Sequence, residues 1–254
     1  PLLYGLRATG NVSDDVRVGI MNTHTTGNNE TTALNQAAVA VQKRFGLSNV
    51  QAIFTNQQGF NKYDPIKKSF SRNASLEGLF KSNDGQKSIW AGVHQSYKDG
   101  FYNQNGFYNL GGEFQNANWN IQTNAMMVQN NYFTDLGYNL RIDNYDAIRD
   151  TVVRLGFTQW LTTLNYTIRP QSGKIQRHSF GLENMLTYNP DWTFNERNNS
   201  LNYFLRFQNT SEISAQIENN AVQLQFPFSF VSEGEPLPAG RYNYSSLNLE
   251  FESD

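Results

Sequence analysis

The sequence contains no cysteine and only three histidines, His24, His94 and His178. The absence of cysteine excludes disulfide bridges and thiolate metal sites. The histidines lie far apart and lack the His-x-x-x-His spacing of a zinc site. Lys and Arg total 20 against 22 Asp and Glu, and the net charge of −2 gives no electrostatic reason to expect nucleic-acid binding. We therefore expect no metal, no cofactor and no nucleic-acid partner.

Long apolar segments are also missing. No run approaches the ~18 consecutive apolar residues of a membrane-spanning helix, and the mean hydropathy is −0.60. Aromatic residues nevertheless make up 14% of the chain. Many rings without aliphatic runs are typical of a membrane β-barrel, because only alternate residues meet lipid and rings form girdles at both interfaces. The chain begins at Pro1 without a signal peptide, so we expect it to be part of a longer exported protein.

Apolar and polar residues alternate singly along most of the chain. In Leu2–Thr9 the even positions are largely apolar, whereas Arg7 and Thr9 fall on the other face. Side chains of a strand change face at every residue, so each such segment has one apolar and one polar face. The same pattern predicts strands at Val16–Met21, Ala37–Arg44, Val50–Asn56, Ala74–Lys81, Ile89–His94, Phe107–Gln115, Trp119–Gln129, Val152–Trp160, Leu161–Arg169, Lys174–Tyr188, Ser200–Asn209, Glu212–Leu224 and Tyr242–Phe251.

The length and spacing of these segments favour a membrane barrel. Many reach ten residues, whereas strands of soluble proteins average about five or six. Tight turns such as Asp84-Gly85 alternate with longer polar connections such as Gln57–Arg72, as they do between the two rims of a membrane barrel. The sequence predicts one all-β domain over residues 1–254, an antiparallel transmembrane outer-membrane β-barrel of roughly 12–14 strands. A soluble sandwich or closed soluble barrel is the alternative.

The alternation also predicts which charged residues face the lumen. In the first hairpin, Leu6 and Val18 share one face and Arg7 and Arg17 the other. The charged residues predicted to face the lumen are Arg7, Arg17, Glu77, Arg154, Arg169, Glu183 and Arg206. The arginines have two open roles. They line an anion- or sugar-selective lumen, or they pair with Glu77, Glu183 and Glu218 and fill it, which is the role we prefer.

No residue pattern predicts catalysis. His178 and Ser179 are the pair closest to a Ser–His nucleophile, but adjacent strand residues point to opposite faces. The acidic loops containing Asp143, Asp146 and Asp150, and Glu233 and Glu235, have the oxygen ligands that Ca²⁺ prefers. They lack the glycine and terminal glutamate of an EF-hand loop. We expect solvated loops and a segment that is not an enzyme.

Several motifs are similar, in the right order, to one protein family. They are Leu3–Gly10, Ala52–Asn56, Asn131–Tyr138, Arg141–Tyr145 and Leu237–Tyr244. Together they resemble a Bacteroidota family of unknown function, a large outer-membrane barrel that follows a module like the family-9 carbohydrate-binding domains. The resemblance implies a carbohydrate-binding module upstream of Pro1, closing strands after Asp254 and no agreed catalytic residues.

Two positions depart from this family, since Ala40 and Gln58 stand where a basic residue is expected. The resemblance gives one further candidate. Asp150-Thr151-Val152 matches the short O-glycosylation sequon of that phylum, which makes Thr151 a candidate modification site.

The function expected from these observations is that of an anchor or scaffold in the bacterial outer membrane. Its partners would be outer-membrane lipid, other outer-membrane or periplasmic proteins, and carbohydrate bound through the upstream module. A pore or transporter for small solutes or oligosaccharides is the alternative, and an outer-membrane enzyme is third. We also expect the barrel to be incomplete at its C-terminal end, because Tyr242–Phe251 has no closing partner in the sequence.

Overall fold

The computed structural model describes residues 1–27, 32–61, 64–136, 141–229 and 234–253. The regular elements in these ranges are all strands. No helix in the described ranges is long and apolar enough to cross a membrane. The strands are β1 (Leu2–Asn11), β2 (Val16–Thr25), β3 (Ala33–Phe45), β4 (Ser48–Asn61), β5 (Asp64–Lys81), β6 (Lys87–Lys98), β7 (Gly106–Gln115), β8 (Trp119–Val128), β9 (Asp143–Asp146), β10 (Thr151–Arg154), β11 (Phe157–Ile168), β12 (Ile175–Tyr188), β13 (Phe194–Phe207), β14 (Glu212–Leu224) and β15 (Gly240–Glu252).

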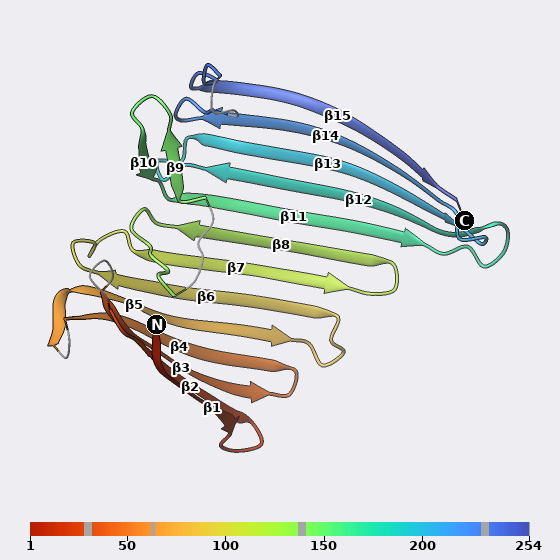
Figure 1. Cartoon of the computed structure of the whole chain (residues 1–254). Coiled ribbons are helices and arrows are strands. Elements are labelled where there is room, and N and C mark those ends of the chain that lie inside the picture. The colour runs from red at the N-terminus through yellow and green to blue at the C-terminus, as the bar shows by residue number, and fades with distance from the viewer. Residues whose placement is uncertain (28–31, 62–63, 137–140, 230–233, 254) are drawn as a thin grey trace.

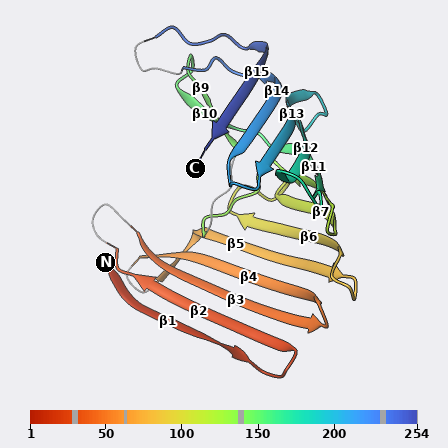
Figure 2. The ribbon, with the colours of Figure 1, turned by 90° about the vertical axis from the view of Figure 1, so that its right-hand side faces the viewer.

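One antiparallel sheet contains thirteen of these strands, in the order β1-β2-β3-β4-β5-β6-β7-β8-β11-β12-β13-β14-β15 (Figure 1). The strands β9 and β10 form a separate hairpin within the connection from β8 to β11. The sheet bends, so that β1–β5 and β13–β15 are steeply inclined to each other (Figure 2). The predicted all-β, antiparallel fold is confirmed. The sheet is not closed, because β1 and β15 are its two free edges.

Two predicted boundaries are wrong. The segment Gln57–Arg72 is not a loop, since β4 and β5 continue through it as a hairpin with a bulge near Gly59. The amide of Gln58 donates to the backbone oxygens of Ile66 (2.8 Å) and Ser69 (3.1 Å). Polar residues therefore extend this hairpin through hydrogen bonds that hydropathy does not reveal.

The segment Val152–Trp160 is not one strand either. Val152 belongs to β10, and β11 begins at Phe157 and runs without a break to Ile168. Gly156 separates the two strands. A Cβ at this glycine would lie 2.3 Å from the backbone oxygen of Val128, so the close passage of the chain requires glycine here.

The strand register divides the side chains of the sheet into two faces. Leu6 pairs with Asn22 and Ile20 with Val39, which places them on one side, called the apolar face. Arg7 pairs with Met21 and Arg17 with Gln42, which places both arginines on the other side, called the polar face. Following the pairs from strand to strand, the apolar face includes Val41, Phe54, Leu76, Val93, Leu110, Trp160, Leu182, Leu201, Ile217 and Leu249.

Burial on these two faces is the reverse of that in a soluble protein. On the apolar face, Leu110 is 59% and Leu249 72% exposed. On the polar face, Ser96 and Thr187 are each 1% exposed. Among the described elements no second layer covers the apolar face, and the one cluster of buried apolar side chains is small. It consists of Val128, Tyr132, Ile142 and Phe157.

Most connections are longer at one end of the sheet than at the other. At one end, called the tight-turn rim, all six contain two to six residues: 12–15, 46–47, 82–86, 116–118, 169–174 and 208–211. At the other end, called the long-loop rim, four of the six connections are longer, namely 26–32, 99–105, 129–156 and 225–239, whereas 62–63 and 189–193 are as short as those of the first rim. All strands of the sheet have ten residues or more.

Candidate functional site: the polar face and its cap

Five of the seven charged residues predicted to face a lumen lie on strands of the polar face. They are Arg7, Arg17, Glu77, Glu183 and Arg206. Arg169 follows β11 and donates from Nη1 to the backbone oxygen of Ala117 (2.5 Å) at the tight-turn rim. Arg154 does not lie on a strand of the sheet, because its segment forms β10.

The ion pairs on this face differ from the expected ones. The arginines were expected to pair with Glu77, Glu183 and Glu218. Instead, Arg206 Nε lies 3.2 Å from Glu212 Oε1, and Glu77 lies 3.4 Å from His94 Nε2. Glu77 also accepts a hydrogen bond from Gln51 (2.5 Å), and Glu218 accepts one from Ser246 (3.2 Å). Each of these pairs joins side chains of two adjacent strands.

Uncharged polar side chains form similar cross-strand pairs. Thr23 donates to Gln36 (3.4 Å), and Gln36 donates to Gln57 (3.0 Å), which links β2, β3 and β4. Gln216 donates to Ser200 (3.2 Å) between β14 and β13. These hydrogen bonds run between neighbouring strands, so they satisfy the polar groups along the wall of the sheet.

The connection from β8 to β11 covers part of the polar face. Its described residues, 129–136 and 141–156, are called the cap. Tyr132 and Ile142 of the cap are buried with Val128 and Phe157, and Phe107 packs against them. The Phe133 amide donates to Ser96 Oγ (3.1 Å), and the Asn131 amide donates to the Gln104 carbonyl (2.8 Å). The cap is therefore fixed to β6–β8 at the long-loop rim.

Arg154 holds three segments of the cap together. Its Nη1 donates to Asp143 Oδ1 (2.7 Å), and its Nη2 donates to the Tyr132 carbonyl (2.8 Å). Its guanidinium lies over the ring of Phe133, with Cζ 4.0 Å from the centroid. The planar guanidinium suits this combination of stacking and directed hydrogen bonds.

Replacing Arg154 with alanine is expected to loosen the cap without unfolding the sheet. The change removes two hydrogen bonds and a cation–π contact, so amides of residues 129–136 should exchange with solvent faster by an order of magnitude or more. Hydrogen exchange with mass spectrometry measures this. Arg149→Ala is the matched control, because that side chain is 72% exposed and its Nε lies 3.5 Å from the buried carboxylate of Asp146, outside residues 129–136. Equal exchange in the two variants would contradict the role of Arg154.

The phenol of Tyr132 is the most perturbed titratable group of the cap. Burial, and secondarily the negative charge of Glu77, raise its pKa to about 12. An unfolded tyrosine loses its proton near pH 10. Between these values the unfolded state binds fewer protons than the folded state, so stability falls as the pH rises.

We therefore expect the wild-type protein to lose more stability than Tyr132→Phe between pH about 10 and about 12. Denaturant unfolding followed at several pH values in this window measures the difference. Tyr244→Phe is the control, since Tyr244 lies on the edge strand β15 and is 60% exposed. Parallel pH profiles for wild type and Tyr132→Phe would show that burial of the phenol does not contribute.

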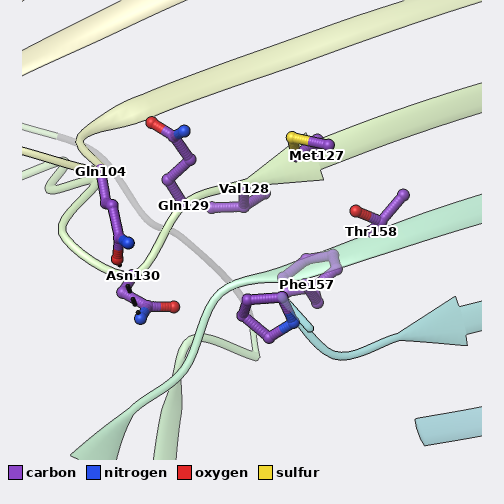
Figure 3. A pocket seen from close by; sticks show the side chains of 8 residues that line it. Gln104, Met127, Val128, Gln129, Asn130, Phe157 and Thr158 are labelled. Carbon is purple, nitrogen blue, oxygen red and sulfur yellow. Dashed lines mark hydrogen bonds between the residues drawn. The ribbon is translucent and has the colours of Figure 1, made fainter. Parts of the chain in front are cut away.

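A small pocket lies beside the cap, where β8 ends and β11 begins (Figure 3). Its volume is about 140 Å³. Figure 3 shows Asn130 donating to Gln104 across it, with Phe157 on the opposite side. Pockets that enclose a drug-sized ligand have roughly 300–1,000 Å³. This one is too small to carry a ligand assignment.

The acidic residues of the cap each bind a different partner and do not form a common cation site. Asp143 binds Arg154, Asp146 accepts the amides of Ile148 and Arg149, and Asp150 accepts the hydroxyl of Tyr145. In the ranges that the structure describes, no three metal-ligating side chains gather. Glu233 lies outside the described residues.

The other residues that the sequence analysis considered, His178, Ser179 and Thr151, do not belong to a common site. His178 is on the apolar face, where its Nδ1 lies 2.9 Å from the Tyr203 hydroxyl, and Ser179 is on the polar face. Thr151 is exposed at the start of β10, and its glycosylation stays a prediction.

Sequence analysis missed the cap and its buried cluster. Tyr132 and Ile142 lie between segments of clear alternation and follow no period of their own. The available signal was the presence of large apolar residues inside a long polar connection.

Comparisons with known proteins found no matching family model, no matching curated protein and no matching solved structure.

Proposed function

We propose that residues 1–254 form most of an outer-membrane β-barrel that acts as an anchor or scaffold. The observation that carries this proposal is the reversed burial of the two faces. A soluble protein does not leave an apolar stripe uncovered over thirteen strands while burying serine and threonine on the opposite face. Lipid is the environment that suits the exposed side, and a water-filled or plugged interior suits the other.

Strand length and rim asymmetry support the same proposal. A tilted strand of about 9–11 residues crosses a bilayer, and each strand of the sheet has at least ten. Membrane barrels have short turns on the periplasmic side and longer loops outside. The tight-turn rim would then face the periplasm, and the cap would face the exterior.

The cap favours a scaffold over a pore. It rests on the polar face of β6–β8 and would narrow the exterior entrance of the lumen. A pore or transporter for small solutes is the second candidate, because Arg7, Arg17, Glu77, Glu183 and Arg206 share the polar face. The upstream carbohydrate-binding module, the envelope partners and the Bacteroidota origin rest on the sequence resemblance alone.

The test is expression of residues 1–254 behind a secretion signal in a Gram-negative host. We expect the protein in the outer-membrane fraction, where sodium carbonate does not extract it. Recovery as a soluble periplasmic monomer would overturn the membrane proposal.

Planar bilayers then separate scaffold from pore. The scaffold predicts little conductance for the intact chain and a clear increase when residues 129–156 are replaced by a short Gly-Ser linker. Steady conductance of the intact chain would favour the pore.

A further inference from the structure

The two free edges of the sheet run in the same direction. Neighbouring strands are antiparallel throughout, and β1 and β15 hold the first and thirteenth positions. Both therefore run from the long-loop rim to the tight-turn rim. The sheet cannot close on itself by antiparallel pairing, because β1 and β15 would meet as a parallel pair.

We propose that an odd number of additional amphipathic strands, not part of residues 1–254, closes the seam between β15 and β1. This inference rests on the proposed membrane function, because unpaired backbone groups at a sheet edge are tolerated in water but not in lipid. The strand against each edge runs from the tight-turn rim to the long-loop rim. With one added strand the count becomes even, as in single-chain bacterial barrels.

The edges determine the pattern of the added strands. On the apolar face, Leu6 of β1 and Leu249 and Phe251 of β15 are 67%, 72% and 66% exposed. The apolar stripe thus reaches both edges, and an added strand must continue it with apolar residues at alternate positions.

The charges on the polar face also predict which charged residues the added strands carry and at which end. Glu250 and Glu252 of β15 lie there near the tight-turn rim, and Arg7 of β1 lies there on the other edge. The strand against β15 therefore carries Lys or Arg near its start, and the strand against β1 carries Asp or Glu. A second copy of this chain does not supply the missing strands. If both copies cross the membrane in the same orientation, β1 of one copy runs parallel to β15 of the other, so the two edges still cannot pair in antiparallel fashion.

A peptide experiment on residues 1–254 in lipid nanodiscs tests the pattern. The probe is a synthetic strand of about 11 residues, with leucine at alternate positions and two lysines near its start on the polar side. We expect it to slow amide exchange in β15 at least tenfold. The same peptide with glutamates in place of the lysines should protect β15 much less. The preference should reverse in the variant Glu250→Lys, Glu252→Lys.

A pair of introduced cysteines tests whether β1 and β15 pair directly with each other. The chain has no native cysteine that could form a competing disulfide. Thr9→Cys and Asn248→Cys occupy polar-face positions on the two edges. A disulfide that forms between them within one nanodisc-inserted chain would show parallel closure and overturn the inference, as would a stable dimer. Equal protection by the lysine and glutamate peptides would overturn the charge pattern. Failure of residues 1–254 to insert into lipid only when the lysine peptide is left out would follow from the open edges. Failure to insert in the presence of the peptide as well would contradict the proposed membrane function itself.

Discussion

Replacing Leu110 with arginine is expected to reduce insertion and folding in the outer membrane severely. Leu110 lies on the apolar face of β7, 59% exposed, between Ala91 of β6 and Ala125 of β8. An arginine that faces hydrocarbon near the midplane costs about 2–4 kcal/mol, which lowers the equilibrium constant for insertion and folding by a factor of about 30 or more. The yield that resists sodium carbonate extraction from outer membranes, compared with wild type, measures the effect.

The matched control is Gln122→Arg on the neighbouring strand β8. Gln122 lies on the polar face, where its register partner is Glu113. The introduced charge faces the interior and meets a carboxylate, so folding should be nearly unchanged. If Leu110→Arg folded normally and Gln122→Arg failed, the assignment of the two faces would be inverted. If both folded normally and the protein were soluble, lipid would not be the environment of the apolar face.

Replacing Gly111 with alanine is expected to be the second most damaging of these changes. The indole of Trp90 crosses this glycine and donates from Nε1 to Asn124 Oδ1 (2.9 Å), so the side chain of β6 passes over β7 to β8. A Cβ at Gly111 would lie 2.3 Å from the indole ring. The ring must move and the hydrogen bond must break, at a cost of about 1–3 kcal/mol.

The adjacent Gly112 supplies the control. A Cβ there meets its nearest neighbour, the carbonyl oxygen of Ser88, at 3.4 Å, and it points to the apolar face. Gly112→Ala should therefore change the unfolding midpoint little. A double-mutant cycle isolates the contact, since Gly111→Ala should be almost neutral once Trp90→Ala has removed the ring. An equal cost in both backgrounds would show that the damage comes from the backbone of β7 and not from Trp90.

Sequence periodicity was sufficient for the type of element and for the two faces of the strands. The opposition of Leu6 and Arg7 follows from a period of two, because a strand cannot place adjacent side chains on the same side. The periodicity failed where polar residues continue a hairpin, as at Gln58, and where a strand is interrupted, as at Gly156. In both places backbone hydrogen bonds and close approach decide the structure, and neither leaves a hydropathy signal.

For the charged residues too, the sequence predicted the face of the sheet but not the contacts. The sequence placed Glu77 and Arg206 on the polar face, but it could not supply their partners. Glu77 binds Gln51 and His94, and Arg206 pairs with Glu212, because antiparallel register brings these residues opposite or diagonal to one another. Register is set by the turns and by the packing of all the strands, which a list of charges does not contain.

By itself the sequence determined an all-β chain with amphipathic strands of membrane-spanning length, since both properties are local and follow from alternation and segment length. Only the tertiary structure decided the rest. It showed that the described residues leave the apolar face uncovered, that residues 129–136 and 141–156 fold back over the polar face, and that β1 and β15 end as parallel free edges. These features depend on contacts between segments distant in the chain and on the number of strands that separate them, and no local pattern encodes either.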